Sequence, residues 1–64
     1  MQIILPDKTM ITFAPDPTPI EEILKRLEIN PLSVIVVRNG MIVPEDVIVS
    51  GDDKVKIIRV SHGG

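Results

Sequence analysis

The first part of the chain carries the polar and apolar pattern of a β-hairpin. The segment "MQIIL" at residues 1–5 is rich in β-branched side chains, and "TMITF" at 9–13 alternates polar and apolar positions. The "PDK" between them consists of residues that favour turns. We therefore expect two paired strands, with Ile11 and Phe13 turned toward the core.

A single helix is predicted after a proline-rich stretch. The prolines of "APDPTP" exclude regular structure up to Thr18. "TPIE" then offers Thr18 as the N-cap, a proline at the first helical position and Glu21 where it can close a capping box. The helix is expected to end near Ile29, because Asn30 suits a left-handed C-terminal position and the next residue is proline.

The predicted helix has one apolar face. Four apolar residues recur at the spacing i, i+3, i+4 and i+7: Ile20, Ile23, Leu24 and Leu27. The opposite face carries charged residues whose i,i+4 pairs have opposite sign, Glu21–Lys25 and Glu22–Arg26. This pattern predicts a helix that packs on a core and has a solvated outer face without a chemical role.

The second half of the chain reads as three further strands. "SVIVV" at 33–37 is apolar on both faces, as expected of a strand covered on both sides by protein or by a partner. Asn39-Gly40 is the preferred pair for a two-residue turn, so "MIV" at 41–43 should fold back. "KVKIIRV" at 54–60 forms the last strand.

The order of elements, β-β-α-β-β-β, predicts an α+β fold. A helix on one face of a mixed sheet, with the last strand beside the first, is the β-grasp or ubiquitin-like layout. We expect one domain over residues 1–60 and a flexible C-terminal arm over 61–64. The 64 residues are close to the smallest size at which one apolar core holds a fold without disulfides or metal.

Composition excludes several functional classes. There is no cysteine, and one histidine with scattered carboxylates does not suggest a metal site. One phenylalanine, no Trp or Tyr and a net charge of -2 give no reason to expect direct nucleic-acid binding. No apolar run approaches a membrane span, and no signal-peptide pattern begins the chain. We expect a cytoplasmic protein with no bound cofactor.

The last strand places apolar residues where polar ones are expected. Lys54 and Lys56 mark its solvent face, and the two-residue period puts Ile58 and Val60 on that same face. Single exposed aliphatic residues, or a twist or bulge, would explain this. The alternative is a surface patch on which a partner docks.

The strand at 33–37 can enlarge that patch. Either Ile35 and Val37 or the alternate pair Val34 and Val36 could lie beside Ile58, and periodicity alone leaves both possibilities open.

The chain ends in "SHGG", which carries no apolar side chain to anchor it. Glycine fits a narrow channel in which a terminal carboxylate can be approached closely. That carboxylate is ionised at neutral pH and is a poor electrophile, so it must be activated, for example by joining it to AMP. Terminal glycines alone also occur by chance.

Taken together, these features resemble the ThiS/MoaD-type ubiquitin-like sulfur carriers. The likeness covers nearly the whole chain and is sharpest in "VVRNGMIVPED" and "GDDKVKIIRVSHGG". Archaeal and bacterial ubiquitin-like modifiers and tRNA-thiolation carriers share this pattern, and "LEINPLSVIVVRNG" is at least as similar to theirs. These motifs do not separate the branches.

The resemblance implies a carrier that is not itself an enzyme. A ubiquitin-activating-type enzyme, holding ATP and magnesium, would adenylate the carboxylate of Gly64, and a persulfide on a donor protein would then leave a thiocarboxylate. Gly63 would thread the channel, while Ile58 and Val60 would form the docking face. A biosynthetic enzyme would accept the sulfur, for thiamine, molybdopterin or tRNA.

Other interpretations remain open. The same adenylate could be captured by a lysine, which would make the chain a protein modifier, or the domain could be a non-covalent interaction module. Arg59 pairs with an acidic partner surface or is simply an edge arginine. His62 has no orienting partner in the sequence pattern, so we expect no catalytic role for it, and no set of catalytic residues can be assembled.

Overall fold

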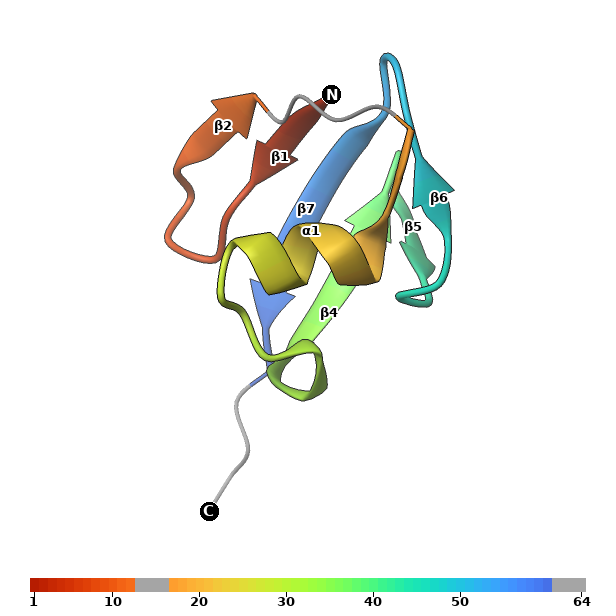
Figure 1. Ribbon diagram of the computed structural model, residues 1–64. Coiled ribbons are helices and arrows are strands. Elements are labelled where there is room, and N and C mark those ends of the chain that lie inside the picture. Colours follow the sequence, from red (N-terminus) through yellow and green to blue (C-terminus); the bar gives the residue numbers. More distant parts are fainter. Residues whose placement is uncertain (13–16, 61–64) are drawn as a thin grey trace.

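The computed structural model describes residues 1–12 and 17–60. One face of a five-stranded sheet is covered by the short helix α1, Ile20–Arg26 (Figure 1). In spatial order β2-β1-β7-β4-β5, the strands are Met10–Thr12, Gln2–Ile4, Lys54–Arg59, Val34–Arg38 and Met41–Val43.

The strand pairing confirms the β-grasp prediction. β1 pairs antiparallel with β2 and parallel with β7, so the last strand lies beside the first. β4 pairs antiparallel with both β7 and β5. The turn between β4 and β5 has positive φ at Asn39 (50°) and Gly40 (86°), as the sequence predicts for a two-residue hairpin.

A second, two-stranded sheet was not predicted. It pairs β3, Thr18–Pro19, with β6, Ile48–Val49. Two-residue strands give almost no periodic signal, and a proline in one of them argues against a strand from sequence alone. The expectation of irregular structure up to Thr18 is therefore wrong at Thr18, while residues 13–16, including Phe13, lie outside the described residues.

The predicted capping box at the helix start is also wrong. The N-cap is Pro19 and makes no side-chain cap hydrogen bond. Backbone carbonyls cap the helix instead, because the Ile20 N–H donates to the Val47 carbonyl at 2.9 Å and the Glu21 N–H donates to the Glu45 carbonyl at 2.8 Å. The helix start is thus fixed by the segment before β6.

The helix ends earlier than the sequence suggested. Its last residue is Arg26, and Glu28, with φ of 59°, takes the left-handed position predicted for Asn30. The Ile29 N–H donates to the Leu24 carbonyl at 2.8 Å, which closes the end in a Schellman-type arrangement. Asn30 instead caps the next turn, a single 3-10 turn at Pro31–Ser33.

The core lies between α1 and the sheet. Its buried apolar residues are Ile3, Ile20, Ile23, Leu24, Val36, Val49, Val55 and Ile57. Three residues of the predicted helical stripe are among them, and the fourth, Leu27, packs against their edge, as does Ile11. Each fully buried aliphatic side chain contributes about 1.5–3 kcal/mol relative to exposure.

Two further expectations concern the ends and surroundings of the domain. In the described parts of the chain, no helix has the length and apolar character that a membrane span requires. The predicted arm at 61–64 lies outside the described residues, so its flexibility stays a prediction.

Candidate functional site

The two faces of β7 differ sharply. Val55 and Ile57 are buried against the helix, whereas Lys54 and Lys56 are exposed on the other side. Ile58 shares the lysine face and is 39% exposed, compared with 2% for its neighbour Ile57. The predicted apolar residue on the solvent face is therefore present, and no bulge is needed to explain it, because β7 pairs in continuous register with β4.

Register settles which residues of β4 join Ile58. Ile35 lies directly opposite Ile58, and Val37 lies opposite Lys56. Val36 is buried on the helix side. Of the two pairs that periodicity left open, the structure therefore selects Ile35 and Val37 as the residues beside Ile58. The side chain of Ile35 is 38% exposed.

The same register extends the apolar face to both edges of the sheet. Ile42 of β5 pairs with Val37, Ile4 of β1 pairs with Lys56, and Met10 of β2 pairs with Ile4. One row across all five strands therefore contains four apolar residues and one lysine. We call this row, with Ile35 and Ile58, the outer face.

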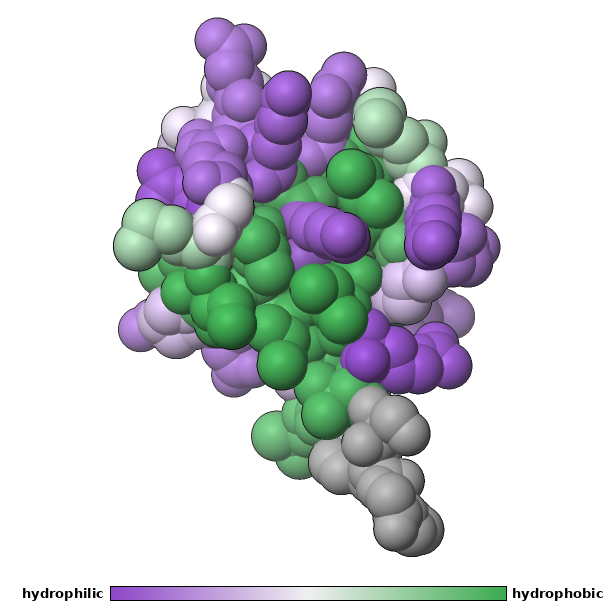
Figure 2. Space-filling model, turned by 180° about the vertical axis from the view of Figure 1, so that it is seen from behind, coloured by the Kyte–Doolittle hydropathy of each residue, from purple (hydrophilic) through white to green (hydrophobic). Residues whose placement is uncertain are grey.

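Figure 2 shows this side of the molecule as an apolar area interrupted by a polar side chain and bordered by polar residues. Sequence reasoning missed three of its members: Ile4, Met10 and Ile42. The position of Ile42 on the outer face could have been predicted from the sequence, since a two-residue turn at Asn39-Gly40 fixes its register against Val37. Ile4 could not, because the partner of a parallel strand is not encoded locally.

The charge of the outer face is opposite to that of the whole chain. The chain has a net charge of -2. The strand residues on this side include Lys54 and Lys56, which pair with Gln2 and Ile4 of β1, and no acidic residue. A protein surface that fits it is apolar and carries a carboxylate opposite Lys56.

Arg59 lies on the other side of the sheet. It lines a shallow hollow of about 260 Å³ together with Leu5, Pro6, Asp7, Leu27 and Ile29, which come from the first turn and the end of the helix. The residues predicted for docking therefore do not form one surface. Ile58, Ile35 and Val37 lie together on the outer face, whereas Arg59 belongs to the helix side.

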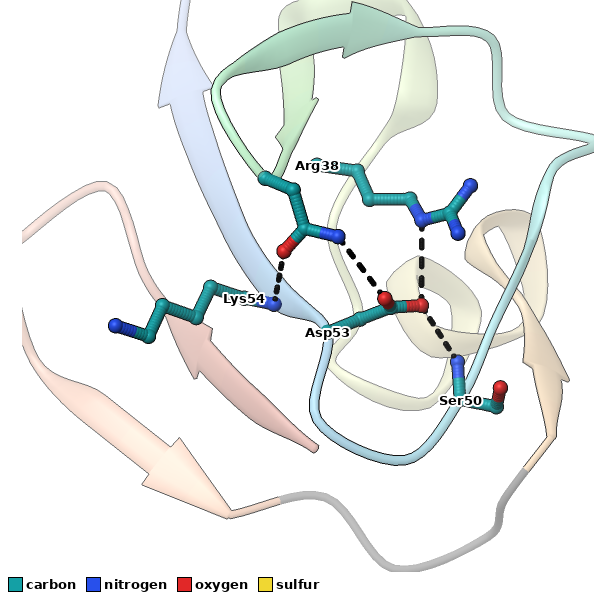
Figure 3. Close-up of polar contacts among 5 residues, drawn as sticks. Arg38, Ser50, Asp53 and Lys54 are labelled. Atoms are coloured by element: carbon teal, nitrogen blue, oxygen red, sulfur yellow. Dashed lines mark hydrogen bonds and ion pairs between the residues drawn. The ribbon is translucent and has the colours of Figure 1, made fainter.

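A polar network holds the end of the sheet where β7 begins (Figure 3). The carboxylate of Asp53 accepts hydrogen bonds from Arg38 Nε at 3.2 Å, Asn39 Nδ2 at 3.0 Å and the Ser50 N–H at 2.9 Å. Asn39 Oδ1 in turn accepts from the Lys54 N–H at 2.9 Å. Two turns are thereby tied together, which supports a structural role for Asp53 over a catalytic one.

These contacts lower the pKa of the Asp53 carboxyl group. The hydrogen bond from the Ser50 N–H, followed by that from the Asn39 side chain and the charge of Arg38, lowers the pKa of the Asp53 carboxyl below its ordinary value. The ionised form is therefore the one that the fold stabilises.

The opposite end of β7 is the end nearer in sequence to the C-terminal glycines. The Val60 N–H donates to the Ser33 carbonyl at 2.9 Å, which extends the pairing with β4 by one residue. Gly63, Gly64 and His62 lie outside the described residues. Four residues follow Val60 in the sequence, and a fully extended chain of that length spans at most roughly 14 Å.

Metal-binding chemistry has no visible basis in the described parts of the chain, where no group of three His, Cys, Asp or Glu side chains could hold an ion.

The comparison with known protein families agrees with the fold. A family model described as small archaeal modifier protein 2 matches residues 5–61. The chain belongs to this family. It is a family of ubiquitin-like β-grasp proteins related to ThiS and MoaD, which confirms the resemblance seen in the sequence. None of the curated proteins compared matches the chain.

Family membership has functional consequences. Small modifiers of this kind are generally non-catalytic, and they interact with an activating enzyme of the ubiquitin-activating type. The family match ends at Ser61, so Gly63 and Gly64 lie beyond it. The chemistry of the terminus is therefore an inference from the sequence.

Proposed function

We propose that this protein is a sulfur carrier that works through the carboxylate of Gly64. The observation that carries the proposal is membership of a ubiquitin-like small-modifier family in a chain whose sequence ends Gly63-Gly64. The lack of cysteine is compatible with it, because sulfur carried by this chain has to reside on the terminus. The activating enzyme supplies ATP, magnesium and the catalytic groups, in the cytoplasm.

The chemistry proceeds in balanced steps. An oxygen of the Gly64 carboxylate attacks the α-phosphorus of ATP, and pyrophosphate leaves. A donor protein's persulfide then attacks the carbonyl carbon of the acyl adenylate, and AMP leaves. The product is an acyl disulfide between Gly64 and the donor cysteine. A thiol attacks the donor cysteine's sulfur and forms a disulfide with it, and the thiocarboxylate on Gly64 is the leaving group. A biosynthetic enzyme accepts it for thiazole, molybdopterin or tRNA.

The outer face is the proposed docking surface for the activating enzyme. Ile35, Val37 and Ile58 supply apolar area, and Val60 continues β7 toward the terminus. The hollow at Arg59 lies on the opposite side, so we assign it no part in the same contact. Docking on the outer face leaves the last four residues free to enter the active site.

A second candidate is a protein modifier, and the family description favours it. In that case a lysine amine attacks the activated carbonyl, AMP leaves, and the amine loses a proton to give an isopeptide bond. Both functions share the adenylate and differ in the nucleophile.

The shared step can be tested with purified components. The chain is incubated with the ubiquitin-activating-type enzyme of the same genome, ATP and magnesium, and ATP–pyrophosphate exchange is followed. We expect exchange with the full chain and none with a variant lacking Gly64. That variant should unfold at the same temperature, because the last strand ends at Arg59. Equal exchange without Gly64 would exclude a specific role for the Gly64 carboxylate, whereas no exchange even with the full chain would leave a non-covalent interaction module.

A further inference from the structure

Leu32 is the most exposed of the large apolar residues that the structure describes. It is 83% exposed, compared with 73% for Ile42 and 71% for Met41. Isolated exposed aliphatic residues are common on protein surfaces, so exposure alone assigns no role. The geometry around Leu32 adds two further observations.

The turn that carries Leu32 is held by its own hydrogen bonds. Asn30 Oδ1 accepts from the Leu32 N–H at 2.9 Å. The Asn30 carbonyl accepts from both the Ser33 N–H at 3.0 Å and the Ser33 hydroxyl at 2.8 Å. Pro31 fixes a further backbone angle at the start of the turn. The leucine is thus presented from a preorganised backbone. The N–H groups of Leu32 and Ser33 already have hydrogen-bond partners, so a protein that covers the turn leaves neither of them unsatisfied.

The same turn is attached to the origin of the C-terminal segment. Ser33, the residue after Leu32, accepts the hydrogen bond from Val60. In Figure 1 the turn at 31–33 lies beside the end of β7. Because the four residues after Val60 span at most roughly 14 Å when fully extended, a protein that holds the terminal glycines also reaches the surface around Leu32.

The other strongly exposed apolar residues lie elsewhere. Met41 pairs with Arg38 at the far end of β4, whereas the turn at 31–33 precedes Val34 at the near end. The four residue-to-residue steps from Val34 to Arg38 separate the two ends of β4 by about 13 Å. Leu32 is therefore distinguished from Met41 by its position next to the terminus and by its rigid turn.

We propose that Leu32 is a recognition residue that inserts into an apolar pocket of the activating enzyme, next to the channel that receives Gly63 and Gly64. This inference rests on the proposed function. The pocket that receives Leu32 is apolar, because the side chain offers only aliphatic surface. The backbone N–H groups of Leu32 and Ser33 need no partner from the enzyme, since they are already hydrogen-bonded within the turn. Contact on this side fixes where β7 ends relative to the active site.

The test measures ATP–pyrophosphate exchange as a function of the concentration of this chain. For Leu32→Ala we expect a KM raised roughly tenfold with kcat unchanged, since the loss is in binding before chemistry. Leu32→Met, which keeps the apolar volume, should restore KM to within about threefold of wild type. Met41→Ala is the matched control, because it truncates another strongly exposed apolar residue at the far end, and its KM should stay within about twofold.

The outcomes separate this inference from the function on which it rests. A wild-type chain that supports no exchange overturns the proposed function and this inference with it. Normal exchange with equal KM values for Leu32→Ala and Met41→Ala overturns the inference alone. A raised KM for Leu32→Ala, rescued by Leu32→Met and accompanied by an unchanged unfolding temperature, supports it.

Discussion

Ile57 and Ile58 are neighbours in β7 and have the same side chain, yet they lie on opposite faces of the sheet and differ in exposure. Ile57 is 2% exposed and packs in the core, while Ile58 is 39% exposed and lies opposite Ile35 on the outer face. The inner face of the sheet is covered by α1, whereas no helix or strand among residues 1–12 and 17–60 covers the outer face. Hydrophobicity alone therefore does not separate residues that hold a fold from residues available to a partner.

The largest expected effect is on stability at the inner face. Ile57→Ala removes buried methyl groups and leaves a cavity, which should lower the free energy of unfolding by about 2–5 kcal/mol. Ile58→Ala should lower it by about 1 kcal/mol or less, because its side chain is already partly in water. Chemical denaturation of both variants measures the difference. Equal losses would show that the two faces are equivalent.

The next effect is functional and belongs to the outer face. Ile58→Asp places a carboxylate in the proposed docking surface and should reduce kcat/KM for activation by roughly thirtyfold. Ile48→Asp is the matched control, since Ile48 is 59% exposed but lies in the two-stranded sheet. It should leave kcat/KM nearly unchanged. If both variants are impaired alike, the outer face is not the docking surface.

A smaller effect is expected from the charge at the centre of the outer face. Lys56 is the only charged member of its row, so Lys56→Glu should lower kcat/KM for activation by roughly tenfold. Lys25→Glu, on the exposed side of the helix, makes the same charge change as a control. The difference between the two variants should shrink at high salt, as expected for a contact between charges. A salt-independent difference would point to packing instead.

The smallest effect is a dependence of stability on pH. Because the folded state lowers the pKa of Asp53, its ionised form adds stability above the pH at which an unfolded aspartate titrates, about pH 4, and this contribution is lost as pH falls through the folded pKa. Thermal unfolding of wild type and Asp53→Asn should therefore differ at neutral pH and converge in acid. A gap that widens on acidification would contradict the assigned network.

The main elements could be predicted from local patterns. The apolar stripe of α1, the Asn39-Gly40 turn and the alternation in β7 each depend on a few neighbouring residues. The short pair β3 and β6 could not be predicted, because two residues carry no periodicity. The helix cap was mispredicted for a different reason: the carbonyls that accept from Ile20 and Glu21 belong to Val47 and Glu45, which are distant in sequence.

The site was predictable in part. Ile58 stood out because it broke the polar pattern set by Lys54 and Lys56, and register then selected Ile35 and Val37. The side of Arg59 followed from the same alternation and could have been predicted from it. Leu32 gave no signal in the sequence, because the role we propose for it depends on the hydrogen bond between Ser33 and Val60, which joins distant segments.

The central claim is that the Gly64 carboxylate is activated and then carries sulfur as a thiocarboxylate, and one measurement tests it most directly. Untagged protein is recovered from its own cells, and its intact mass is recorded before and after treatment with a thiol-alkylating reagent. We predict a species heavier by the difference between sulfur and oxygen that reacts with the reagent although the chain has no cysteine. Chains joined through Gly64 to lysines of other proteins would assign the modifier function instead. A free carboxylate with neither form would contradict the claim.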